Sequence, residues 1–314
     1  MADKRILRIL SEQKIFIVII IIGFILSLRS SYFLSFANIV NIFLFISIEG
    51  VIVIGMAYLI IVGELDLSVG STMALSGVLA IVFQKFGVPV GIIAGISVGV
   101  VVGIINGILV TKLRLTSIAT TLGMMVLLNG VVFALTKSQT VKGTNTAFML
   151  IAHSEFFKIP LSVIIFIVLI VIFELVLKRT LFGRNVFAVG GNITASKFFG
   201  IRVDRIRIMT FILTGFLAGT AGVILASKLT IASGRIGLNT PILVITAVLL
   251  GGISLSGGEG SIFKAFQGIL LIGILNNAMV LLRISPFIQD VIRGLLLILI
   301  LMIDAINIRR SRYI

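Results

Sequence analysis

Residues 86–111 read FGVPVGIIAGISVGVVVGIINGILVT and contain no Asp, Glu, Lys or Arg. A helix of roughly 20 apolar residues is long enough to cross the hydrocarbon core of a bilayer. Three more uncharged runs of similar length follow, at 115–136, 208–227 and 236–258. With 59% hydrophobic and 12% charged residues, the chain of 314 residues is too apolar for a soluble protein. We therefore predict an integral membrane protein.

The distribution of apolar runs predicts an all-α fold, a bundle of roughly ten transmembrane helices that forms one domain over residues 1–314. The expected spans are 15–34, 42–62, 68–86, 89–111, 116–136, 160–177, 208–228, 241–260, 262–282 and 286–306. Residues 15–28 have a basic flank like a signal peptide, but no small-residue cleavage pattern follows them. We expect this segment to be retained as the first span.

The basic residues are predicted to lie mainly on one side of the membrane. The net charge is +15, and most of the 26 Lys and Arg residues fall in the segments that lie on one side if the N-terminus is cytoplasmic. This positive-inside bias predicts a multi-pass protein with both termini in the cytoplasm, and it accounts for the charge without a nucleic-acid partner. There is no cysteine, and the single histidine, His153, has no second ligand at metal spacing. We therefore expect His153 at the surface and no metal or cofactor.

Two pairs of segments resemble each other and suggest an internal duplication. The segment GELDLSVG at 63–70 resembles GGISLSGG at 251–258, and GIIN at 103–106 resembles GILN at 273–276. A duplication predicts two pseudo-symmetric halves of five spans each. Because five is odd, the halves would be inverted relative to each other in the membrane.

Both glycine-rich segments adjoin apolar pieces that are too short to cross a bilayer alone, at 71–84 and 241–250. Glycine lets the chain leave helical geometry, and the freed backbone groups then need partners in other helices or in a wet cavity. We therefore predict broken helices. The segment LSGGE at 255–259 also matches a signature of ABC ATPases, but the chain has no GxxxxGK[ST] phosphate loop, so a helix break is the better interpretation.

Polar residues inside apolar runs are candidates for a solute pathway, because burying them in hydrocarbon is unfavourable and amides and carboxylates can bind hydroxyl groups. The alternative for each is a structural hydrogen bond between helices or, for Glu64 and Asp66, a helix cap at the membrane surface. Glu49 suits both roles, a position in the pathway and a structural hydrogen bond between helices. Asn277 is a further candidate for either role. Asp290 and Arg293 are three residues apart and are predicted to pair with each other. The predicted pathway residues are Asp66, Ser68, Asn106, Asn129 and Asn276.

The segment 178–207 is strongly basic and is predicted to be a cytoplasmic amphipathic helix. Its apolar face would consist of Phe187, Phe198, Phe199 and Ile201, with Lys197, Arg202 and Asp204 facing water. Such a helix suits a groove on a partner protein.

Three segments together resemble the permease subunits of bacterial ABC importers of the ribose type. They are GELDLSVGS at 63–71, GRNVFAVGGN at 183–192 with GIRVDR at 200–205, and GGISLSGG at 251–258. The resemblance implies a non-catalytic permease of the bacterial inner membrane that dimerises with a second permease. Two ATPase subunits, which bind the ATP, would dock on its cytoplasmic side, and an extracytoplasmic binding protein would deliver the substrate. Members of the family carry monosaccharides such as ribose, galactose or xylose, and some carry autoinducer-2 or nucleosides.

By the same resemblance, the ATPase-coupling residues fall between Phe187 and Asp204: Phe187, Gly190, Gly191, Asn192, Gly200, Ile201 and Asp204. The chain departs from the family pattern at Glu64, where a glycine is usual, and at 193–196, where acidic and alanine residues are usual. Alternatives are a permease for branched-chain amino acids and an ion-driven secondary transporter. A membrane enzyme would need an acid-base or metal cluster that the residues do not suggest. A homodimer and a pair of similar permeases both remain open.

Overall fold

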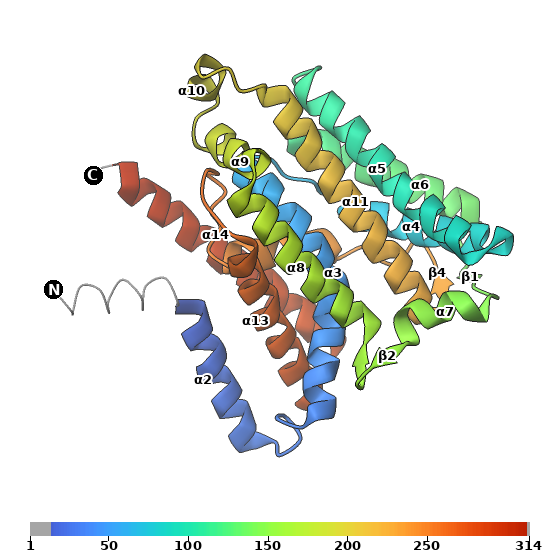
Figure 1. Ribbon diagram of the computed structural model, residues 1–314. Helices are drawn as coiled ribbons and strands as arrows, with labels where there is room; N and C mark the ends of the chain where they lie inside the picture. Colours follow the sequence, from blue (N-terminus) through green and yellow to red (C-terminus); the bar gives the residue numbers. More distant parts are fainter. Residues whose placement is uncertain (1–13, 313–314) are drawn as a thin grey trace.

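The computed structural model describes residues 14–312, which form an almost entirely helical bundle (Figure 1). Within these residues, eight helices are long and apolar enough to cross a membrane, and two shorter apolar helices, α2 and α12, bring the number at predicted span positions to ten. The ten are α2 (Lys14–Arg29), α3 (Phe36–Val62), α4 (Val69–Phe83, continued by the 3₁₀ turn η1 at Gln84–Phe86), α5 (Val88–Thr111), α6 (Ser117–Thr136), α8 (Leu161–Arg179), α11 (Val203–Leu229), α12 (Thr240–Leu250), α13 (Ile262–Leu281) and α14 (Pro286–Arg312).

The two ends of the bundle are built differently (Figure 1). At one end lie the short helices α9 (Leu181–Gly191) and α10 (Ile193–Phe198). At the other end lie α7 (Thr146–His153) and four two-residue strands: β1 (Val141–Lys142), β2 (Glu155–Phe156), β3 (Ile159–Pro160) and β4 (Ile231–Ala232). Strands β1 and β4 pair antiparallel with Val141 opposite Ala232, and β2 pairs with β3. His153 is exposed, as predicted.

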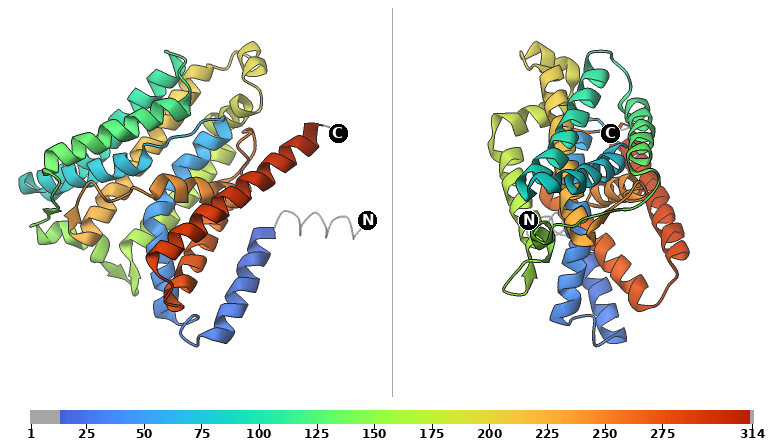
Figure 2. Two further views of the ribbon diagram at one scale, coloured as in Figure 1. Left: turned by 180° about the vertical axis from the view of Figure 1, so that it is seen from behind. Right: turned by 90° about the vertical axis from the view of Figure 1, so that its right-hand side faces the viewer.

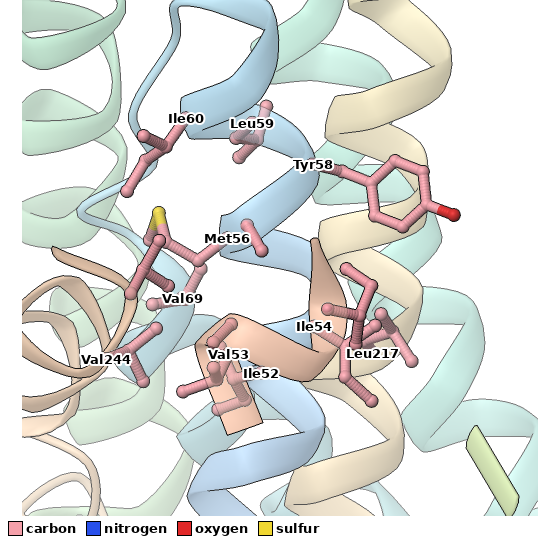
Figure 3. Close-up of a cluster of buried hydrophobic side chains, with 14 of the residues drawn as sticks. Ile52, Val53, Ile54, Met56, Tyr58, Leu59, Ile60, Val69, Leu217 and Val244 are labelled. Atoms are coloured by element: carbon pink, nitrogen blue, oxygen red, sulfur yellow. The ribbon is translucent and has the colours of Figure 1, made fainter. Parts of the chain in front are cut away.

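Helix α3 is the centre of the bundle. It is apolar on all sides, and every residue from Gly50 to Val62 is buried, as expected for a helix surrounded by others. Helices α8, α9, α11, α12 and α13 all contact it. Figure 3 shows side chains of α3 packed with Val69 of α4, Leu217 of α11 and Val244 of α12.

Helices α5 and α11 approach closely along a row of glycines that the sequence analysis did not single out. Every fourth residue of α5 from Gly91 to Gly107 is glycine, which places all five on one face. A Cβ atom built on Gly99 would lie 2.1 Å from the carbonyl oxygen of Gly215 in α11, and one on Gly215 would lie 2.1 Å from that of Gly99. Small residues are what allows two membrane helices to come so close.

We predict that Gly99→Ala destabilises the protein, because the new methyl group overlaps the Gly215 carbonyl and must push α5 away from α11. Overpacking of this kind costs about 1–3 kcal/mol. Gly123→Ala in α6 is the matched control, since no atom lies within 4 Å of a Cβ there and helix propensity then favours alanine. Thermal unfolding in detergent measures both. Equal melting temperatures for the two variants would contradict the tight α5–α11 contact.

The packing follows two equivalent halves. Helix α5 packs against α4 and α11, and α13 packs in the same way against α12 and α3. The pattern of helix contacts is therefore preserved when α3 is exchanged with α11, α4 with α12 and α5 with α13. The end of α3 lies beside the start of α11, where Glu64 forms a salt bridge with Arg207. The corresponding helices α3 and α11 therefore run in opposite directions, as inverted halves require (Figure 2).

One of the two sequence similarities does not reflect this symmetry. Residues 63–68 connect α3 to α4, whereas 251–261 connect α12 to α13, which is a different position in the repeat. The two connections also touch, since the amide of Gly258 donates to the carbonyl of Ile61 at 2.8 Å. Segments related by inversion lie on opposite sides of the membrane, so the similarity of 63–70 to 251–258 is not evidence of duplication. The pair at 103–106 and 273–276 lies on the corresponding helices α5 and α13.

The predicted single helix over 178–207 is also wrong. The segment contains the end of α8, then α9 and α10, and then the first turn of α11. The boundary between α9 and α10 falls at Asn192, whose side chain accepts a hydrogen bond from the amide of Ala195 and so begins α10. Asparagine prefers such N-cap positions to helix interiors.

Candidate translocation site

The connection between α3 and α4 enters the interior of the bundle. Helix α3 ends at Gly63, which has a left-handed φ of 87° that glycine adopts without strain. The following Asp66 and Ser68 are almost completely buried. The freed backbone amides are satisfied by α6, because the hydroxyls of Ser117 and Thr121 accept from Leu65 and Leu67. The break is thus enclosed by protein rather than exposed to lipid.

Three of the predicted pathway residues form one cluster at this break. The carboxylate of Asp66 accepts hydrogen bonds from the amide of Ser68 at 2.8 Å and from its hydroxyl at 2.6 Å. The side-chain amide of Asn106 in α5 donates to Asp66 at 3.3 Å and to Ser68 at 3.0 Å. The carbonyl oxygen of the Asn106 side chain has no partner within the described residues.

A second carboxyl group lies at the start of the other short helix, α12. Glu49, in the middle of α3, accepts a hydrogen bond from the hydroxyl of Thr240 at 3.1 Å, and its other oxygen is buried with no partner among residues 14–312. Helices α4 and α12 also start close together, since a Cβ on Gly70 would lie 2.1 Å from the carbonyl oxygen of Gly237. Each short helix therefore begins inside the bundle with a carboxyl group beside its positive end.

The remaining predicted pathway residues lie elsewhere. Asn276 in α13 accepts from Arg293 of α14, and Arg293 also pairs with Asp290 at 2.9 Å, which confirms that predicted pair. Asp290 and Arg293 line a hollow of about 240 Å³ between α12, α13 and α14, together with Asn239 and Thr246 of the α12 region. Asn129 is half-buried on α6, eight residues or roughly 12 Å along the helix from Thr121.

Two other polar residues have structural partners. Glu64 is buried and forms a salt bridge with Arg207. Asn277 and Asn38 exchange two hydrogen bonds, at 3.0 and 2.8 Å, which join α13 to α3. Among the residues that the structure describes, no group of His, Cys, Asp or Glu has the arrangement of a metal site.

The predicted coupling residues gather at the α9–α10 end, and several face inward. Phe187 and Ile201 pack against the core around α3. A Cβ on Gly190 would lie 1.8 Å from the carbonyl oxygen of Ile61, and one on Gly258 would lie 2.8 Å from the Cα of Gly191.

The rest of the coupling segment faces outward. Asn192 caps α10, Gly200 has a left-handed φ of 77°, and Asp204 pairs with Lys112 at 2.9 Å. The most exposed apolar side chains of α10 and its end are Phe198 and Phe199, at 87% and 85% exposure.

Proteins that are similar in sequence to this chain support the interpretation of the site as part of a transporter. Residues 38–301 match the family model described as branched-chain amino acid transport system / permease component. The chain belongs to this permease family. The permease is 36% identical to the L-arabinose transport system permease protein AraH of Escherichia coli K12, over 89% of this chain and 86% of the relative. It is 39% identical to the ribose import permease protein RbsC of Bacillus subtilis, over 92% and 91%.

A third relative, the probable ABC transporter permease protein YphD of Escherichia coli K12, is 37% identical over 97% of this chain and 92% of the relative. No solved structure matches the permease. The match over nearly the full length, together with eight long apolar helices, identifies a multi-pass membrane permease of the ABC sugar-transport type.

We predict that Asp66→Ala destabilises the permease by about 2–4 kcal/mol, because the donors of Ser68 and Asn106 lose a buried acceptor. Asp290→Ala is the control: it also removes one carboxylate, but one whose side chain is 53% exposed, so the loss should stay below about 1 kcal/mol. Chemical unfolding in detergent compares the two. A loss at Asp66 no larger than at Asp290 would show that the cluster does not hold the break.

Proposed function

We propose that this permease forms the pathway for a monosaccharide such as ribose or arabinose in an ATP-driven importer. The observation that carries the proposal is the pair of short helices, α4 and α12, that start inside the bundle with Asp66 and Glu49 beside them. Carboxylate and amide groups bind sugar hydroxyls, and helix starts inside a bundle are a recurrent form of transport site. The relatives named for arabinose and ribose support the substrate class.

In the proposed pathway, substrate hydroxyls pass polar groups near Asp66, Asn106 and Asn276, with Ser68 and Asn129 close to the route. Asp66, Ser68 and Asn106 are buried in this conformation, so a solute reaches them only when the bundle opens. Contacts of this kind must be weak, since tight binding would trap the solute. The permease itself makes and breaks no covalent bond, and ATP is bound and hydrolysed by a separate subunit.

The substrate is tested by reconstituting the permease in vesicles with its ATPase and binding protein. We expect uptake of labelled ribose or arabinose that stops when ATP is withheld, and no uptake of leucine. Alanine at Asp66, Asn106 or Asn276 should lower the uptake rate while ATPase activity persists. Leucine uptake without sugar uptake would favour a branched-chain amino-acid permease, and sugar uptake without the ATPase would favour an ion-driven transporter. Autoinducer-2 and nucleosides are the further substrates to compare.

The ATPase is proposed to dock at the α9–α10 end, which is then cytoplasmic, as are both termini. Helix α10 projects from the bundle (Figure 1), and Phe198 and Phe199 present two apolar rings that are almost fully exposed. An apolar pair on a projecting helix suits a hydrophobic groove. The α7 end is then extracytoplasmic and faces the binding protein, and a second permease completes the transporter.

We predict that Phe198→Ala with Phe199→Ala lowers binding of the ATPase subunit by at least tenfold, since each exposed ring loses an apolar contact worth more than about 1 kcal/mol. The matched control is Phe156→Ala with Phe157→Ala, because these rings are 65% and 82% exposed at the opposite end. Co-purification and ATP-dependent uptake measure the effect. Equal ATPase binding by the two double variants would exclude α10 as the docking helix.

A further inference from the structure

A basic hollow of about 720 Å³ lies at the α9–α10 end, between the turn that joins α5 to α6 and the start of α11. Its wall contains six cationic side chains and one carboxylate. The cations come from two distant parts of the sequence: Lys112 and Arg114 from the turn, and Lys197, Arg202, Arg205 and Arg207 from α10 and α11. A positive-inside charge bias requires basic residues on this side, but it does not require them to converge on one hollow.

Most of this charge is not paired with a carboxylate within the part of the chain that the structure describes. Lys112 pairs with Asp204 at 2.9 Å, and Arg207 pairs with Glu64. The other four, Arg114, Lys197, Arg202 and Arg205, form no salt bridge within residues 14–312. Cations crowded around a hollow repel one another unless an anion joins them, and arginine is suited to phosphate because its guanidinium group can donate two parallel hydrogen bonds.

The surroundings of the hollow are apolar and exposed. Leu113 and Leu115 flank Arg114 on the turn and are 63% and 48% exposed, and Ile118 is exposed in the first turn of α6. On α5, Ile105 and Ile108 are also exposed. In a membrane protein such side chains at helix ends face lipid chains. A ligand with an anionic head and apolar tails therefore matches both parts of this region.

We propose that the hollow binds the headgroup of an anionic phospholipid of the adjacent leaflet, with the phosphate held by Arg114 and Arg205 and the acyl chains lying along α5 and α6. Basic pockets between helices at the cytoplasmic surface bind such headgroups. The lipid would link the α5–α6 turn to α10, which carries Lys197, and so join the proposed docking segment to the membrane helices. The site does not depend on which solute the permease carries.

The test is native mass spectrometry of delipidated permease titrated with phosphatidylglycerol or phosphatidylcholine. We expect saturable binding of phosphatidylglycerol and at least tenfold weaker binding of phosphatidylcholine. Arg114→Gln with Arg205→Gln should weaken phosphatidylglycerol binding by at least tenfold. The control, Arg179→Gln with Arg184→Gln, removes two exposed arginines outside the hollow and should leave the affinity unchanged. If the double glutamine variant does not fold, Arg202→Gln alone is compared with Arg184→Gln.

Three results would overturn the proposal. Equal loss of lipid in the two double variants would mean that only net charge matters. Displacement of phosphatidylglycerol by millimolar inorganic phosphate or ATP would assign the hollow to a free phosphate. Unchanged lipid binding combined with loss of ATPase binding would assign it to acidic residues of the partner subunit.

Discussion

The structure depends on one constraint: where a membrane helix breaks, the protein itself must satisfy the freed backbone groups, because hydrocarbon offers them no partner. The break after α3 meets this condition with side chains of two other helices. The hydroxyls of Ser117 and Thr121 in α6 accept hydrogen bonds from backbone amides of the break. The side-chain amide of Asn106 in α5 donates to the carboxylate of Asp66, which lies in the break. Helices α5 and α6 are therefore required around α4, which fixes the arrangement of the first half of the bundle.

The start of the other short helix, α12, is held by different residues. Helix α12 begins at Thr240 against Glu49 of α3, so the carboxyl group comes from the other half of the chain, whereas Asp66 belongs to the break it stabilises. The two short helices start side by side, and the absence of a side chain at Gly70 and Gly237 allows their backbones to meet. The pseudo-symmetry is thus one of helix packing, and it does not extend to the residues at the two breaks.

The sequence predicted those features that depend on composition along one segment. The eight long apolar helices of the described residues, the two shorter ones and the Asp290–Arg293 pair follow from apolar length and from helical spacing. Features that depend on contacts between distant segments were missed or misplaced. The hydroxyls of Ser117 and Thr121 gave no signal, because serine and threonine are common at helix starts. The repeated glycines of α5 did carry a signal, the four-residue spacing. The similarity of 63–70 to 251–258 misled because similar glycine-rich turns arise at any helix break.

The break after α3 and the α9–α10 end of the bundle form one packed unit. Ile61, in the last turn of α3, accepts a hydrogen bond from the amide of Gly258, and Gly190 of α9 lies against the same carbonyl so closely that no Cβ atom would fit. Two residues later the chain leaves α3 at Gly63 and proceeds to Asp66. Closely packed interiors transmit displacement rather than absorb it. We therefore expect a movement of α9 to displace the end of α3, and with it first Glu64 and then the buried cluster of Asp66, Ser68 and Asn106.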